Sequence, residues 1–183
     1  MTAAAGEVRL IGGQWKRSKL PVLDRPGLRP TPDRVRETLF NWLGQDLSGW
    51  RVLDAFAGSG ALGFEAASRG AREVVLLERD AVLARSLSAS KDRLRADTLQ
   101  VHAGDALSWM SSAAHGRFDL VMIDPPFDAG LHGAATDAAL NLLSPGGWLY
   151  VESNGALAPP AGCEVHRHLQ AGAVHAHLWR RTA

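Results

Sequence analysis

The sequence predicts an α/β protein with a mainly parallel β-sheet, helices on both faces of the sheet and a small N-terminal β-hairpin. Three observations support this prediction. Short apolar runs alternate with helix-length segments between residues 51 and 151. A glycine-rich turn follows the first run, and an acidic residue closes or soon follows each of the first four runs. Repeated strand–helix units of this kind form parallel sheets with right-handed crossovers.

The first part of the chain is expected to form a basic arm. Two strand-like runs, residues 8–11 and 18–22, flank Gly12-Gly13 and predict the hairpin. A linker rich in proline, glycine and arginine follows it. We therefore divide the chain into an arm with its linker, residues 1–26, and a main domain, residues 27–183.

The main domain is predicted to begin with a helix and to continue with alternating strands and helices. Thr31 is the expected N-cap of the first helix, Pro32 its first residue and Gly44 its end. The other expected helices are 61–69, 81–94, 105–111 and 134–143, and the expected strands are 51–54, 74–78, 99–102, 118–123 and 148–151. The tail, residues 163–180, alternates in character and predicts a terminal hairpin, which brings the sheet to seven strands.

The composition fits one globular domain. The chain has 183 residues, of which 46% are hydrophobic and 21% are charged. No apolar run approaches the roughly 20 residues that a membrane helix needs, and the first residues lack the pattern of a signal peptide. Cys163 is the single cysteine, so no internal disulfide can form. We expect a cytoplasmic monomer.

Positive charge is concentrated near the start of the chain. Residues 1–36 carry eight basic and three acidic side chains, a net charge of +5, whereas the remainder has a net charge of −4. A basic arm on a mildly acidic body suggests a surface that faces a polyanion, and a solvated terminal segment is the alternative interpretation. The candidate RNA-binding residues are Arg9, Trp15, Lys16, Arg17 and Lys19.

The glycine-rich turn contains Gly58, Gly60 and Gly63 and follows Asp54. The spacing literally matches the fingerprint of dinucleotide-binding proteins, with Glu78 at the usual distance. In that class, however, the strand runs straight into the first glycine so that a pyrophosphate can sit on the helix N-terminus. Here an acid closes the strand. A carboxylate at this place suits a cationic amino-acid group and would repel a pyrophosphate.

S-adenosylmethionine has the required chemistry, because its α-amino group and its sulfonium are both positive. The glycines at positions 58 and 60 allow the backbone to approach its methionine portion. Glu78 is expected to accept hydrogen bonds from the ribose hydroxyls. Asp105, with Ala106 beside it, is expected to receive the exocyclic amine of the adenine. A tight turn with nothing bound is the alternative interpretation.

The sequence Asp124-Pro125-Pro126-Phe127 directly follows the fourth strand. The two prolines stiffen the loop and remove two N–H donors, which leaves a rigid set of acceptors. The Asp124 carboxyl and the Pro125 carbonyl are placed to accept both N–H bonds of an exocyclic base amine. The Phe127 ring offers a stacking surface for the base. We expect in-line methyl transfer at this loop, with no metal required.

The chain resembles the bacterial family of 16S ribosomal RNA guanine-N2 methyltransferases, which have the Rossmann-like class I methyltransferase fold. The stretches that carry the resemblance are 9–16, 27–43, 54–63 and 124–127. The resemblance implies that Arg29, Pro30 and Thr31 lie near the methionine end of S-adenosylmethionine. It also implies that the arm binds RNA, and that the substrate is 16S rRNA in the small ribosomal subunit or its assembly intermediate.

Other functions fit parts of the same pattern. A methyltransferase that acts on DNA adenine N6 or on a protein amide can use a similar proline-rich loop, although the chain is short and its arm is basic. A nicotinamide-dependent oxidoreductase matches the glycine spacing but gives no role to Asp124. A non-catalytic RNA-binding protein would not need the acids and glycines. Two His-x-His pairs in the tail, at 166–168 and 175–177, are expected to lie on a solvated strand face rather than to bind zinc.

Overall fold

The computed structural model describes residues 4–126 and 130–182 and contains a two-stranded sheet and a seven-stranded sheet. The strands are β1 (Ala4–Arg9), β2 (Lys19–Leu23), β3 (Arg51–Asp54), β4 (Glu73–Glu78), β5 (Leu99–Ala103), β6 (Phe118–Ile123), β7 (Leu143–Ser153), β8 (Cys163–Ala171) and β9 (Val174–Arg181). The helices are α1 (Asp33–Trp42), α2 (Ala61–Ser68), α3 (Ala81–Leu94), α4 (Ala106–Ser112) and α5 (His132–Leu142).

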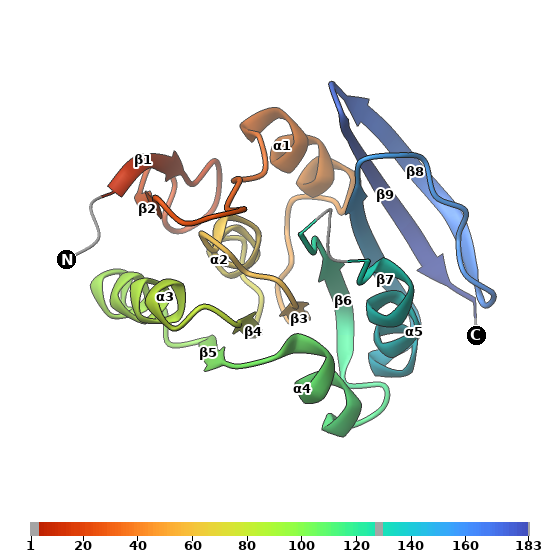
Figure 1. The fold of residues 1–183 in the computed structure, drawn as a ribbon. Coiled ribbons are helices and arrows are strands. Elements are labelled where there is room, and N and C mark those ends of the chain that lie inside the picture. The colour runs from red at the N-terminus through yellow and green to blue at the C-terminus, as the bar shows by residue number, and fades with distance from the viewer. Residues whose placement is uncertain (1–3, 127–129, 183) are drawn as a thin grey trace.

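The large sheet has the strand order β5-β4-β3-β6-β7-β9-β8. Its first five strands are parallel, and β9 and β8 are added antiparallel at one edge. The β1–β2 hairpin and the β8–β9 hairpin lie on opposite sides of the molecule (Figure 1). The predicted fold, a mainly parallel seven-stranded sheet with flanking helices and an N-terminal hairpin, is confirmed.

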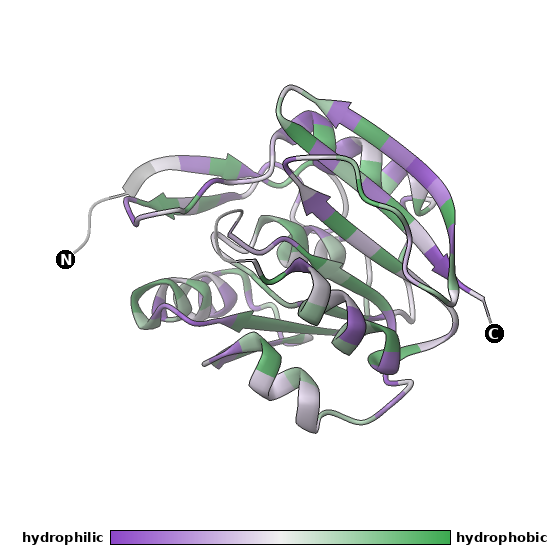
Figure 2. Ribbon diagram, turned by 45° about the vertical axis from the view of Figure 1, so that its right-hand side comes forward, coloured by the Kyte–Doolittle hydropathy of each residue, from purple (hydrophilic) through white to green (hydrophobic). Residues whose placement is uncertain are grey.

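The central strands are apolar because they are covered on both faces. One face packs against α1, α2 and α3 through residues such as Phe40 and Phe64, and the other face packs against α4 and α5 through residues such as Met110. Figure 2 shows hydrophobic central strands, whereas hydrophobic and hydrophilic residues alternate along the terminal hairpin. No helix in the described residues is long and apolar enough to span a bilayer.

The start of α1 differs from the prediction. Pro32 occupies the N-cap position, and no side chain caps the helix. Thr31 is therefore not the N-cap. Its side chain is buried and lies instead beside the carboxyl groups of Asp124 and Glu152, one of which can accept its hydroxyl proton. The proline still favours the start of the helix. Its fixed φ of −55° leads into the first turn, and the N–H that it lacks would have no acceptor within the helix.

The N-terminal hairpin forms as predicted, but β1 begins earlier and ends earlier than the first predicted run, and β2 is shifted by one residue from the second. A loop of residues 10–18 joins β1 to β2 and lies against α2. Leu10 and Leu20 are fully buried in the core. Residues 10, 11 and 18 of the two predicted runs are therefore loop, and Leu10 and Leu20 dock the hairpin onto the body.

The terminal hairpin forms as predicted, but its four histidines are not arranged as strict alternation requires. The register of β8 against β9 shifts between Val165 and Arg167. His166 consequently packs edge-on against Trp148, with ring centroids 4.7 Å apart. The first His-x-His pair is thus split by an irregularity that the sequence pattern does not reveal.

Candidate active site

The chain order in the sheet reverses between β3 and β6, which are adjacent although five elements separate them in sequence. Ligands bind at the carboxyl ends of strands at such a switch point. Asp54 ends β3, and Ile123 of β6 pairs with Val151 of β7. Asp124 and Glu152, each one residue further on, are therefore neighbours. Three carboxyl groups meet at this edge, on the face covered by α1 and α2.

Sequence reasoning missed Glu152. The fifth strand was expected to end at Val151, but β7 continues to Ser153 and carries Glu152 inside the strand. Glu152 is only 3% exposed, and the Tyr150 hydroxyl donates a hydrogen bond of 2.6 Å to its Oε1. The signal available in the sequence was an acidic residue directly after the apolar run of the fifth strand. The other acids were identified by the same pattern.

Asp54 is 1% exposed and lies under the glycine turn. The Gly63 N–H donates a 3.0 Å hydrogen bond to its Oδ2, while its Oδ1 is buried without a hydrogen-bond partner among the described residues. Burial is the main cause that raises the pKa of Asp54 to about 7; the Gly63 N–H opposes the rise, and the charges of Glu78 and Glu152 contribute to it. An orphaned, buried carboxylate oxygen favours a cationic ligand at this position.

Asp124 shares this environment. Burial, the charge of Glu152 and a hydrogen bond to Glu152 raise the pKa of Asp124 well above its usual range, and a hydrogen bond from Thr31 opposes the rise. Burial also raises the pKa of Glu152. Pro125 is buried, Pro126 is exposed, and Phe127 lies outside the described residues.

The glycine turn requires glycine at two positions. Gly58 and Gly60 adopt φ angles of +56° and +84°, in the left-handed region that other residues rarely occupy. Glu78 stabilises the turn from β4: its Oε2 accepts the Gly58 N–H at 2.8 Å, and its Oε1 accepts the Asp80 N–H at 2.9 Å. The predicted cofactor-binding residues Asp54, Gly58, Gly60 and Glu78 therefore lie together.

The other predicted cofactor-binding residues lie at the rim. Asp105 is exposed at the end of β5 and caps α4, since its Oδ2 accepts the Ser108 N–H at 2.9 Å. Ala106 is buried beside it. Arg29 and Pro30 are exposed, in contrast to the buried Thr31 next to them.

The predicted RNA-binding residues lie on the hairpin and its loop. Arg9, Lys16 and Arg17 are exposed, and Lys19 forms an exposed ion pair with Glu7 at 3.2 Å. Trp15 is half-buried and packs against the core. The arm thus presents cations to solvent, while its tryptophan also anchors it.

The loop of the arm is held by polar groups of α2. Glu65, fully buried, accepts hydrogen bonds from the Ile11 N–H at 2.8 Å and the Gly12 N–H at 3.1 Å. The same carboxylate pairs with the buried Arg36 of α1 at 3.3 Å. Ser68 accepts from the Trp15 N–H at 2.9 Å. An acid inside an otherwise apolar helix was a signal of this contact in the sequence.

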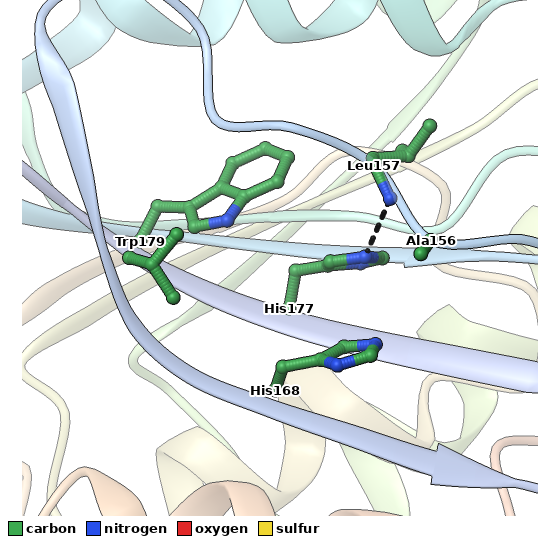
Figure 3. Close-up of a pocket in the computed structure, with 6 residues that line it drawn as sticks. Ala156, Leu157, His168, His177 and Trp179 are labelled. Carbon is green, nitrogen blue, oxygen red and sulfur yellow. Dashed lines mark hydrogen bonds between the residues drawn. The ribbon is translucent and has the colours of Figure 1, made fainter.

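Histidines line an apolar pocket of about 160 Å³ at the terminal hairpin, together with Leu157 and Trp179. His177 accepts a 3.0 Å hydrogen bond from the Leu157 N–H, and His168 stacks on it (Figure 3). Trp179 belongs to the core on the α4–α5 face, so this pocket lies on the other face of the sheet from the three acids. Within residues 4–126 and 130–182, no group of three or more metal-ligating side chains is present.

Comparison with known proteins gives the family of the chain. Residues 8–180 match the family model described as conserved hypothetical protein 95. The chain is 43% identical over 190 aligned positions to ribosomal RNA small subunit methyltransferase D of Escherichia coli, covering 99% of this chain and 93% of that protein. The protein of the same name from Haemophilus influenzae is 44% identical over 151 positions, covering 80% of this chain and 75% of that protein.

Solved structures agree with this relationship. The Escherichia coli protein yhhF superposes with a TM-score of 0.86 at 42% identity, covering 97% of this chain and 99% of that one. A Haemophilus influenzae structure superposes with a TM-score of 0.82 at 35% identity, covering 97% and 100%. The chain therefore belongs to the family described as conserved hypothetical protein 95, and the kinship with small-subunit ribosomal RNA methyltransferases expected from the sequence is confirmed.

Proposed function

We propose that this protein transfers the methyl group of S-adenosylmethionine to the exocyclic N2 amine of a guanine in 16S rRNA of the small ribosomal subunit. The observation that carries the proposal is the convergence of Asp54, the glycine turn and the Asp124-Pro125 loop at the switch point of the sheet. The names of the relatives support ribosomal RNA of the small subunit as the substrate class.

The residues present fit S-adenosylmethionine. The unpartnered Oδ1 of Asp54 is suited to the positive methionine end of the cofactor. Glu78, which already fixes the turn, retains acceptor capacity for the ribose hydroxyls. The bound cofactor would supply an electrophilic methyl group on a sulfonium, so the protein needs to provide position and electrostatics.

The Asp124-Pro125 loop would hold the target amine. The lone pair of an arylamine is delocalised into the ring, so the amine is a weak nucleophile. Acceptance of its two N–H bonds by the Asp124 carboxyl and the Pro125 carbonyl would orient the nitrogen toward the methyl group. We further propose that the exposed cations of the arm, Arg9, Lys16, Arg17 and Lys19, contact RNA phosphates, and that Trp15 contributes apolar surface.

Labelled methyl transfer tests the proposal. Small ribosomal subunits from cells that lack this protein should incorporate label from S-adenosylmethionine, and nucleoside analysis should recover N2-methylguanosine. Parallel reactions with 16S rRNA alone, with DNA and with protein measure the alternative substrates. Label in another nucleoside would refute the guanine assignment, and label only in DNA or protein would refute the ribosomal substrate.

A further inference from the structure

We propose that Glu152 is the final acceptor of the proton that the target amine releases, and that Asp124 passes the proton on to it. This inference rests on the proposed function, because it assigns a route to a proton that methyl transfer to an amine must release. Glu152 would not touch the substrate. It is a positioning residue and proton acceptor that acts through Asp124.

The geometry places the two carboxyl groups in one hydrogen-bonded pair. The pairing of Ile123 with Val151 sets Asp124 beside Glu152, with both side chains on the same face of the sheet and close enough for the two carboxyl groups to share a proton. Two carboxylates in contact cannot both ionise at neutral pH without a compensating cation, so the pair holds a proton.

The donors around the pair decide which group carries that proton. The Tyr150 hydroxyl donates a 2.6 Å hydrogen bond to Glu152 Oε1, which favours the ionised form of Glu152. Thr31 lies beside both carboxyl groups, and its single hydroxyl proton can be donated to only one of them at a time. The resting pair is therefore a neutral Asp124 whose O–H donates to an ionised Glu152. The carbonyl oxygen of Asp124 stays available to the amine.

Among the described residues, the groups that face the pair are polar and none of them is basic. Asp54 lies on β3, Tyr150 lies on β7 itself, and Thr31 precedes α1. From α5, His132 bonds to the backbone carbonyl of Glu152 and not to its carboxyl group. On β9, Ala176 pairs with Glu152, and the neighbouring His175 and His177 point to the opposite face. The buried Arg36 of α1 forms an ion pair with Glu65.

The step balances in atoms and charge. The amine nitrogen bonds to the methyl carbon as the carbon–sulfur bond breaks, and the electron pair remains on sulfur. The nitrogen loses one proton to Asp124 while Asp124 gives its own proton to Glu152. A sulfonium and an ionised Glu152 become a neutral thioether and a neutral Glu152. Asp124 is neutral before and after the step, because it gains one proton and gives up another. Charge is cancelled inside the buried site and is not expelled from it.

The test compares the full-length wild type with Glu152→Gln, which keeps the shape of the side chain, and with the exposed Glu164→Gln as the control. Carbon-13 labelling of the carboxyl groups follows the titration of Asp124 in each protein without any substrate. We expect its midpoint to move to lower pH in Glu152→Gln, because the like charge is gone, and to stay unchanged in the control. An unchanged midpoint in Glu152→Gln overturns the pairing.

Kinetics with small ribosomal subunits give the second measurement. We expect Glu152→Gln to lower kcat by about 100-fold, the lower range for loss of a proton acceptor, and to leave the KM for S-adenosylmethionine within about twofold. The fall of kcat toward acid pH in the wild type should disappear in the variant. Wild-type kcat with an unchanged pH profile overturns the relay. If the wild type itself methylates no substrate, the proposed function fails, and the carboxyl titration still decides the pairing.

Discussion

Replacement of Asp54 by asparagine should stabilise the free protein at pH 8. Asp54 is buried, and its pKa rises from an ordinary 3.8 to about 7 in the folded state. Each pKa unit corresponds to about 1.4 kcal/mol, so ionisation of the folded form costs on the order of 4 kcal/mol. Asparagine removes this cost and keeps an oxygen for the Gly63 N–H. Its amide hydrogens need acceptors, so we expect a net gain of about 2 kcal/mol.

The pH dependence follows from the direction of the change in pKa. A carboxyl group with a raised folded pKa favours the folded state below its unfolded pKa, and this contribution is lost as the pH rises toward the folded value. The advantage of Asp54→Asn should therefore grow from pH 4 to pH 7 and remain constant above that. Differences between variant and wild type cancel the contributions of other titrating groups that do not contact position 54.

Urea unfolding at pH 5 and pH 8, with and without S-adenosylmethionine, measures both effects. Without the cofactor the variant should be more stable at pH 8. At a cofactor concentration 100 times the Kd the wild type should gain about 2.7 kcal/mol, and the variant should gain nothing. Asp97→Asn, at an exposed position, is the control and should match the wild type throughout. A variant less stable than the wild type at pH 8 would refute this reasoning.

Three further predictions concern the loop and the arm. Asp124→Ala should reduce methyl transfer by at least about 100-fold while cofactor affinity, measured by calorimetry, changes little; unaltered turnover would exclude amine activation by this loop. Joint replacement of Lys16, Arg17 and Lys19 by glutamine should weaken RNA binding and flatten its salt dependence, with an identical salt slope arguing against the arm as the contact. Gly13→Ala should cost more than about 2 kcal/mol in urea unfolding, because φ is +77° and the added carbon would lie 1.9 Å from a backbone oxygen of α2; a cost near zero would show that the loop adapts.

The sequence predicted the parts of the site that obey one local rule. Asp54, Glu78 and Asp124 follow apolar strands, and the meeting of strand ends at one edge needs only the fold class. Glu152 obeys the same rule but was missed because the length of β7 depends on its pairing with β9, which local pattern does not contain. The boundary of a strand is set by its neighbours as much as by its own residues.

Other differences arise from contacts between segments far apart in the chain. Thr31 has the chemistry of an N-cap, yet it serves the acids because those carboxyl groups lie within its reach once the sheet has formed. His166 turns away from its partner through a register irregularity in the terminal hairpin. Propensity describes what a residue can do locally, and tertiary contacts select among these options.

Glu65 connects three parts of the chain through a single side chain, because it holds the loop of the arm, the α1 arginine and its own helix. Loss of any one attachment leaves a buried charge incompletely compensated, which makes partial detachment of the arm costly. The arm, α1 and α2 should consequently open as one cooperative unit, with the Ile11 and Gly12 amides exchanging their hydrogens as slowly as those of α2. Slow exchange at these two amides would mean that the exposed cations of the arm are held at a constant distance from the acids of the site before any RNA binds.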